Sequence, residues 1–206
     1  MKIILENTGR RFNKEWIFKN VNITFSPNQF YAILGSNGSG KSTFLQLVSG
    51  YLMPSEGKME YHHESIIEQD KIYQHISIAS PALELFEDLT LEETIHYHFQ
   101  FKNILQRIDI KQLPELLQLK GNEKKQLRNF SSGMKQRVKL GLAILSDSSV
   151  LLLDEPTSNM DKNGILWYKE LITKYTKDRI VLVASNKMEE DYFFCQHHLE
   201  IENYKR

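Results

Sequence analysis

The segment that most constrains the fold of this chain is a glycine-rich run, Gly35-Ser36-Asn37-Gly38-Ser39-Gly40-Lys41-Ser42-Thr43. It follows an apolar run typical of a strand, Phe30–Leu34, and it precedes a helical pattern that stops at Gly50. The glycines let the backbone curl so that successive N–H groups point inward, and a helix N-terminus adds its positive end. Strand, glycine loop and helix in this order predict a loop that holds a triphosphate.

Two side chains of this loop have predicted roles of their own. Lys41 is placed to reach the β- and γ-phosphates, and the hydroxyl of Ser42 is placed to ligate magnesium. The remaining residues of the run would contact phosphate through the backbone. The alternative is a flexible Asn-Gly turn followed by an unrelated helix, and the fixed spacing in the right context disfavours it.

The hydrophobic pattern predicts an α/β fold. Residues 1–34 carry short apolar runs (Ile3–Leu5, Trp16–Phe18, Val21–Phe25 and Phe30–Leu34) separated by turn residues, which indicates several strands, some antiparallel. Further strands are expected at 58–62 and 76–79. Two fully apolar runs, Val150–Leu153 and Ile180–Val183, are typical of parallel strands buried on both faces.

Between these strands the period of the hydrophobic pattern becomes helical, from about Leu89 to Leu145. Thr90 and Glu93 have the spacing of a capping box and predict a helix start. From Met134 to Leu145 the apolar residues Val138, Leu142 and Leu145 share one helical face. The pattern therefore predicts an α/β core interrupted by a mostly helical insertion.

Composition excludes several classes of protein. The 26 Lys and Arg residues balance 26 Asp and Glu residues, so no overall field attracts nucleic acid or an anionic membrane. The single cysteine, Cys195, excludes an internal disulfide and suits a reducing cytoplasm. No apolar run approaches the roughly 20 residues that span a bilayer. We expect a soluble protein without a signal peptide, whose connection to a membrane is made through a partner.

A second motif consists of the acids Asp154 and Glu155, which directly follow the first of the two apolar runs, Val150–Leu153. In a phosphate-loop enzyme the first acid holds Mg²⁺, directly or through water. The second is placed to polarise a water aimed at the γ-phosphate. The alternative, two acids solvated at a strand end, is less favoured because the Lys41 loop is also present.

A third motif makes the resemblance to a family specific. The run Phe130–Arg137, with Ser131 and Gly133, resembles the signature motif of ABC-type ATPases. Pro156-Thr157-Ser158 continues the strand as in that family, and the segment Ser158–Asp161 resembles its D-loop. The likeness covers essentially all 206 residues. It implies one ABC-type ATPase domain over residues 1–206, with a phosphate-loop core, a mostly parallel sheet, an N-terminal antiparallel β subdomain and a helical subdomain inserted at about 82–147.

The resemblance also implies an assembly. Domains of this family dimerise head-to-tail, and each ATP lies between the phosphate loop of one subunit and the signature motif of the other. Ser131 and Gly133 would then contact the γ-phosphate of the partner's nucleotide. Phe12 matches the aromatic position that stacks on adenine, and its alternative is an ordinary core phenylalanine.

The chain departs from the family pattern at three places. Ser132 and Met134 replace a glycine and the glutamine of the signature motif. Ser80-Pro81 stands where the family has a glutamine, and neither residue has the reach of glutamine. Asn186 stands where the family has its switch histidine, and asparagine can donate a hydrogen bond but carries no charge. We therefore expect a divergent branch with slow turnover.

These features predict the ATP-hydrolysing subunit of an ABC transporter, with ATP and Mg²⁺ at its site and a separate membrane-spanning subunit as partner. Its compact size resembles exporter ATPases, including those of heme exporters. We expect it at the cytoplasmic face of the membrane, held there by its partner. The rivals are a soluble ABC ATPase in assembly or repair, and a nucleotide-dependent scaffold with little turnover. Zinc binding at Cys195-Gln196-His197-His198 is disfavoured, because the ligand spacing is wrong and an ordinary terminal strand is expected there.

Overall fold

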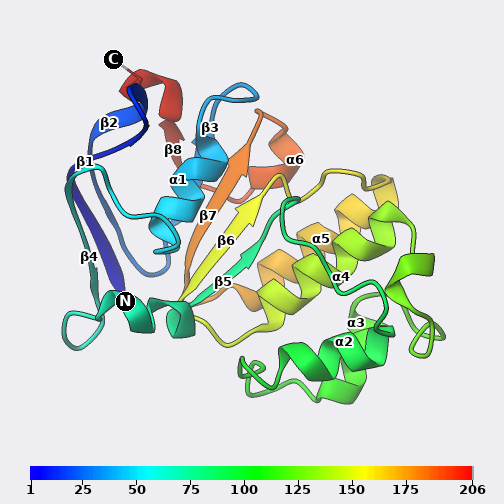
Figure 1. Cartoon of the computed structure of the whole chain (residues 1–206). Coiled ribbons are helices and arrows are strands. Elements are labelled where there is room, and N and C mark those ends of the chain that lie inside the picture. The colour runs from blue at the N-terminus through cyan, green and yellow to red at the C-terminus, as the bar shows by residue number, and fades with distance from the viewer. Residues whose placement is uncertain (206) are drawn as a thin grey trace.

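The computed structural model describes residues 1–205 and contains two sheets (Figure 1). The larger sheet has five strands in the order β5-β6-β7-β3-β8, and every neighbouring pair is parallel. Its strands are β3 (Phe30–Leu34), β5 (Ile76–Ala79), β6 (Val150–Asp154), β7 (Ile180–Ser185) and β8 (His197–Glu200). The mostly parallel sheet expected from the sequence is therefore confirmed, and His197 and His198 lie in its terminal strand, directly after Cys195 and Gln196.

Both faces of this sheet are covered, which explains the unbroken apolar runs of its central strands. Leu151 and Leu153 of β6 point into a core that they share with α4 (Ser132–Leu145) and α5 (Lys162–Tyr175). Val150 and Leu152 point into a second core on the other face, which holds α1 (Lys41–Val48). Figure 1 shows α1 on one side of β6 and β7, with α4 and α5 on the other. A strand buried on both faces has no polar side to alternate with, as predicted.

The smaller sheet is antiparallel and contains most of the N-terminal segment, in the order β2-β1-β4. Its strands are β1 (Lys2–Phe12), β2 (Glu15–Phe25) and β4 (Glu56–His62). The apolar runs at 16–18 and 21–25 both lie in the single strand β2. The pairing of β1 with β2 shifts register on both sides of Thr8, and these shifts accommodate the polar residues between the two runs. The apolar face of this sheet packs into the second core with α1.

The segment between β5 and β6 is less helical than its sequence pattern predicts. It contains α2 (Leu91–His98), α3 (Leu113–Leu116) and α4, joined by turns and the short 3-10 helices Ile110–Gln112 and Leu127–Asn129. The capping box at the start of α2 is confirmed: Thr90 accepts from the Glu93 backbone, and the Glu93 side chain accepts from the Thr90 backbone. The long helix α4 packs on the sheet beside α5, whereas α2 and α3 lie farther out (Figure 1).

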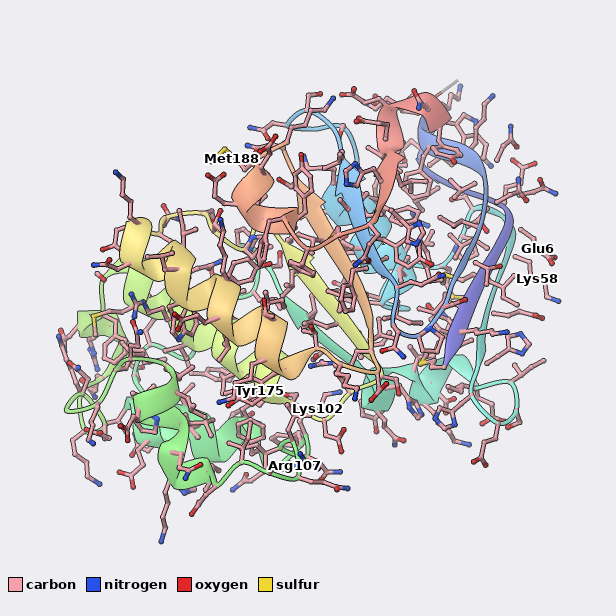
Figure 2. The ribbon with its side chains drawn as sticks, turned by 180° about the vertical axis from the view of Figure 1, so that it is seen from behind. Glu6, Lys58, Lys102, Arg107, Tyr175 and Met188 are labelled. Atoms are coloured by element: carbon pink, nitrogen blue, oxygen red, sulfur yellow. The ribbon has the colours of Figure 1, made fainter. Side chains whose placement is uncertain are left out.

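Two of the remaining elements follow the carboxyl ends of β7 and β8, and the third precedes the amino end of β5. They are the short helix α6 (Glu189–Tyr192) and the 3-10 helices Gln69–His75 and Ile201–Tyr204. Among the helices of residues 1–205, none combines the length and the apolar character that crossing a bilayer would require. Seen from behind, Met188 marks the carboxyl end of β7, while Lys102, Arg107 and Tyr175 lie at the opposite end of the sheet (Figure 2).

Candidate functional site

The predicted site residues converge at the carboxyl ends of the parallel strands, where ligands of open α/β sheets bind. The glycine loop follows β3, Ser80 follows β5, Asp154 ends β6, and Asn186 follows β7. Because β6 and β7 pair with Asp154 opposite Ala184, the two central strands end at the same level. Residues separated by up to 151 positions in the chain, from Gly35 to Asn186, are thereby brought to one edge.

The glycine loop presents backbone donors without partners of their own. The first bond of α1 runs from the Phe44 N–H to the Gly40 carbonyl at 2.8 Å, so the N–H groups of Lys41, Ser42 and Thr43 have no acceptor inside the helix. Gly40 has a φ of +106°, and a Cβ there would collide with the side chain of Ile17. Only glycine allows this close turn, and the result is a concave row of N–H groups suited to phosphate oxygens.

The ammonium group of Lys41 is held beneath this loop. Its Nζ donates to the carbonyls of Gly35, at 3.1 Å, and Ser36, at 3.0 Å, and the residue is 5% exposed. The buried hydroxyl of Ser39 has no hydrogen-bond partner among the described residues. The loop therefore combines a fixed cation, free N–H groups and a spare hydroxyl, and this set of donors fits a polyphosphate.

The sequence did not predict a further contact to this loop from the C-terminal segment. The carboxylate of Glu202, in the last 3-10 helix, accepts from the Ser36 backbone N–H at 3.1 Å and from the Ser36 hydroxyl. These bonds lower the pKa of Glu202, with the Ser36 side chain as the largest cause. No local sequence signal connects residues that lie 166 positions apart.

Asp154 is a buried carboxylate, 5% exposed, beside the start of α1. Burial raises its pKa, while hydrogen bonds from Ser42 and Ser80 and the charge of Lys41 act in the opposite direction. Ser42 and Asp154 line one cavity of about 650 Å³. A hydroxyl and a carboxylate oxygen are hard ligands of the kind that Mg²⁺ accepts alongside substrate phosphates, so this pair fits the implied metal.

Ser80 reaches the site in a way that the sequence did not predict. The shorter reach of Ser80 compared with glutamine predicts an altered link between the helical segment and the site. Ser80 is buried and its Oγ donates to Oδ2 of Asp154 at 3.2 Å. The same Oγ accepts from the backbone N–H of Ala82, at the entry to the helical segment, at 3.3 Å. One hydroxyl therefore connects that segment to the predicted metal ligand.

Glu155 lies where two cavities meet. It lines the cavity of Asp154 and a second one, of about 350 Å³, formed by the glycine loop and Ile17. Its backbone has a φ of +45°, which is uncommon for a residue other than glycine. A hydrogen bond of 2.9 Å from its N–H to the Ala184 carbonyl holds this turn. The carboxylate is thus presented to the loop from a turn fixed against β7.

The signature residues lie apart from the glycine loop within one chain. Ser131 is the N-cap of α4 and accepts from the Met134 N–H at 3.2 Å. Gly133 sits against the Asn159 carbonyl, since a Cβ there would approach that oxygen to 3.2 Å. Both signature residues line a cavity of about 510 Å³ that shares no lining residue with the loop cavity. One chain does not bring the two motifs together.

Two predicted positions lie at the surface of the site. Phe12 is 44% exposed at the end of β1, with the Arg10 guanidinium 4.6 Å from its ring centre. The alternative of an ordinary core phenylalanine is therefore wrong, and adenine stacking stays a prediction. Asn186 is exposed in the turn after β7. Ile17, which the sequence did not single out, is an apolar residue directly against Gly40 of the glycine loop.

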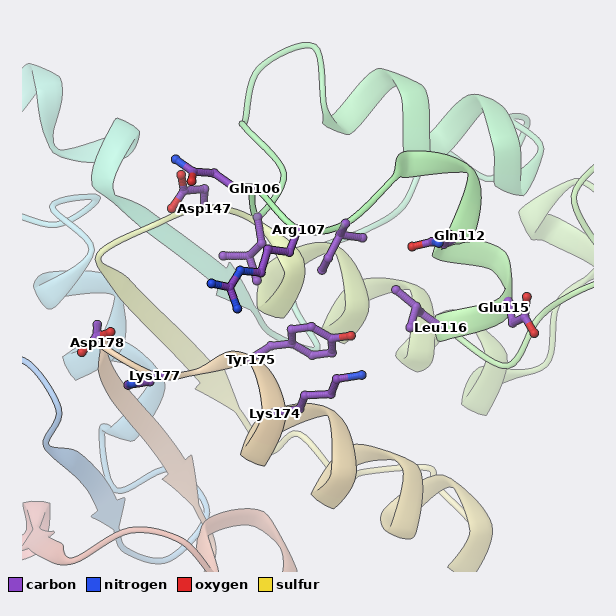
Figure 3. A pocket seen from close by; sticks show the side chains of 12 residues that line it. Gln106, Arg107, Gln112, Glu115, Leu116, Asp147, Lys174, Tyr175, Lys177 and Asp178 are labelled. Carbon is purple, nitrogen blue, oxygen red and sulfur yellow. The ribbon is translucent and has the colours of Figure 1, made fainter.

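A larger cavity, of about 1000 Å³, lies away from all of these residues (Figure 3). It opens at the amino ends of β6 and β7, between the helical segment and the end of α5. Its charged side chains are of both signs: Arg107, Lys174 and Lys177 against Glu115, Asp147 and Asp178. Size alone therefore does not identify the site, because the phosphate-binding chemistry lies at the opposite end of the sheet.

Comparison with known proteins agrees with this geometry. A family model described as "ABC transporter" matches residues 18–158. Phospholipid-transporting ATPase ABCA3 of Mus musculus is 31% identical over 179 residues, which are 84% of this chain and 10% of that protein. The Fe(3+) ions import ATP-binding protein FbpC of Escherichia coli O157:H7 is 32% identical over 163 residues, 77% of this chain and 47% of that protein.

This chain thus spans about a tenth of the first relative and about half of the second. Among solved structures, a putative ABC transporter ATP-binding protein from Pyrococcus furiosus superposes with a TM-score of 0.83. The superposition covers 99% of both chains at 19% identity, and it bears on the fold alone.

Proposed function

Because this chain belongs to the ABC transporter family and is one of its ATP-binding domains, we propose that it binds and hydrolyses ATP to power transport through a separate membrane-spanning partner. The observation that carries this proposal is the meeting of the glycine loop, Asp154 and Glu155 at one edge of the sheet. A cation, free N–H donors and two acids in that arrangement are the parts that phosphoryl transfer requires.

In the proposed mechanism the glycine loop binds the triphosphate of ATP. Its N–H groups and the Lys41 ammonium take the phosphate oxygens, and Phe12 stacks on the adenine. Ser42 and Asp154 would hold Mg²⁺, which would neutralise charge on the phosphates. Hydrogen bonds from Ser42 and Ser80 restrict the position of this buried carboxylate.

Glu155 acts as the general base. Its carboxylate accepts a proton from a water whose oxygen attacks the γ-phosphorus, while the bond between that phosphorus and the bridging oxygen of ADP breaks. Inorganic phosphate and ADP are the products. Asn186 donates a neutral hydrogen bond to the γ-phosphate. Since charged hydrogen bonds are about twice as strong as neutral ones, asparagine in this place stabilises the transition state less than a histidine cation would.

The separation of the two cavities supports a head-to-tail dimer. Ser131 and Gly133 lie in a cavity of their own, so each needs the nucleotide of a second subunit to complete a site. The start of α4 is suited to this role, because a helix N-terminus attracts anions. ATP would close such a dimer and hydrolysis would reopen it.

An exposed aromatic surface supports the membrane-spanning partner. Phe86, Tyr97 and Phe101 form a chain of edge-to-face contacts, with ring centres 5.5 and 5.3 Å apart, and they are 63%, 44% and 70% exposed. Aromatic residues exposed together are typical of interaction surfaces. We place the subunit at the cytoplasmic face of the membrane through this partner.

Titration calorimetry with ATP and Mg²⁺ tests the binding step. Lys41→Ala removes the side-chain cation of the loop, and we expect it to abolish ATP binding. Lys71→Ala is the matched control, because Lys71 is an exposed lysine paired with Glu68, away from the site. Equal ATP affinity in Lys41→Ala and the parent would overturn the assignment of the loop.

A further inference from the structure

Asp191, on the short helix α6, is a buried carboxylate that contacts two segments of the proposed site. It is 2% exposed. Oδ1 accepts from the Thr157 backbone N–H at 2.9 Å and from the Thr157 hydroxyl at 2.6 Å. Oδ2 accepts from the Ser185 hydroxyl at 2.6 Å. A carboxylate is stable in such a place only when donors surround it, and here three short bonds do so.

The two partners of Asp191 lie beside the two residues proposed to act on the γ-phosphate. Thr157 is two positions after Glu155, in the turn that presents that carboxylate. Ser185 is the last residue of β7, directly before Asn186. A single side chain therefore joins the turn of the general base to the strand end of the switch position.

The turn after β6 is supported from other directions as well. The Gln136 side chain, from α4, donates to the Pro156 carbonyl at 2.9 Å. The hydroxyl of Tyr168, from α5, donates to the backbone carbonyl of Asp191 at 2.8 Å. Tyr168 thus bonds the backbone of α6 and leaves the Asp191 carboxylate to Thr157 and Ser185. That carboxylate is a side-chain link between the two site segments, beside the backbone bond of 2.9 Å from the Glu155 N–H to the Ala184 carbonyl.

We propose that Asp191 is a positioning residue for ATP hydrolysis, which fixes the turn of Glu155 relative to the strand end of Asn186. This inference rests on the proposed function. The rate of a reaction in a preorganised site is sensitive to small displacements, and a misplacement of about 1 Å can cost about 10²-fold. Loss of either link should therefore lower the catalytic rate while leaving the glycine loop, and with it ATP affinity, intact.

Two variants each remove one side-chain hydrogen bond of the link, and a third serves as control. Ser185→Ala removes the bond to Oδ2, and Thr157→Val removes the hydroxyl bond to Oδ1. Tyr168→Phe breaks a buried hydrogen bond at Asp191 but leaves its carboxylate untouched. We expect kcat to fall about tenfold in the first two variants with the Kd for ATP unchanged, and to stay near the parent value in the third. Melting temperatures measured alongside separate this from a loss of stability.

Hydrogen exchange of the nucleotide-free protein gives a readout that does not depend on activity. Ser185→Ala should speed exchange in the segment 155–161, although it changes no residue there, while Tyr168→Phe should not. Parent-like kcat in Ser185→Ala and Thr157→Val, or unchanged exchange in 155–161, would overturn the role of Asp191. A parent that hydrolyses no ATP would overturn the proposed function instead, and hydrogen exchange would still decide whether Asp191 joins the two segments.

Discussion

Replacement of Ser80 by alanine tests whether the hydroxyl that stands in the place of the family glutamine serves the metal site. Ser80→Ala deletes the donor to Oδ2 of Asp154 and, with it, the acceptor of the Ala82 N–H. Hydrogen bonds to charged groups contribute about 1.5–3 kcal/mol. The observed separation of 3.2 Å is longer than the usual O–H···O range, so we take about 1 kcal/mol, a factor of about 5 in an equilibrium constant.

The direction of the effect follows from the chemistry of the carboxylate. A donor stabilises the ionised form, so its loss raises the pKa of Asp154, which burial already raises. We expect the acid limb of the pH–rate profile to move upward. The Mg²⁺ concentration for half-maximal ATP hydrolysis should rise about fivefold.

The assay is steady-state ATP hydrolysis measured against pH and against Mg²⁺ for the parent, Ser80→Ala and Ser80→Thr. Threonine keeps a hydroxyl on Cβ and should stay close to the parent. If Ser80→Ala has the Mg²⁺ requirement and the pH profile of the parent, the hydroxyl does not serve the metal site and the reasoning is refuted.

Two further predictions concern other positions. Burial lowers the pKa of His98 to about 4, so as the pH falls this histidine takes up a proton in the unfolded chain before it does so in the folded protein. The free energy of unfolding should therefore decrease between about pH 6.5 and 4. Urea unfolding at pH 5 should give a free energy about 1–2 kcal/mol lower than at pH 7. His98→Asn should lose this dependence, and an unchanged pH dependence would contradict it. Asn186→His should raise ATP turnover with little change in ATP affinity, and it should make the rate depend on pH near neutrality. Steady-state ATPase rates measured against pH test this. An equal or lower rate in a folded variant would mean that Asn186 is not the switch position.

The central sheet could be predicted from the sequence because its strands are covered on both faces. Nothing but apolar residues fits such a strand, and the runs Val150–Leu153 and Ile180–Val183 therefore mark β6 and β7 almost to their ends. The helical segment was less predictable, because distant contacts set its short elements. For example, Ile104 forms a β-bridge with Ser146, and the Leu105 N–H bonds the Leu145 carbonyl.

The candidate site divides in the same way. The glycine loop and the acids Asp154 and Glu155 are contiguous motifs whose spacing carries their chemistry, so the sequence identifies them. The bonds of Ser80 to Asp154 and of Asp191 to Thr157 join residues 74 and 34 positions apart, and only the fold creates them. A serine or an aspartate at such a position has no periodicity or motif that would distinguish it from a surface residue.

The measurement that tests the central claim most directly is ATP hydrolysis by the purified parent and by Glu155→Gln, with Mg²⁺ and with ATP binding recorded on the same samples. The substitution keeps the shape of the side chain and removes the base. We predict that turnover falls by roughly 10²–10⁴-fold while ATP binding persists, and that the unhydrolysed nucleotide traps a dimer visible by size exclusion. Hydrolysis by Glu155→Gln at the parent rate, or a parent that binds ATP without turning it over, would contradict the account.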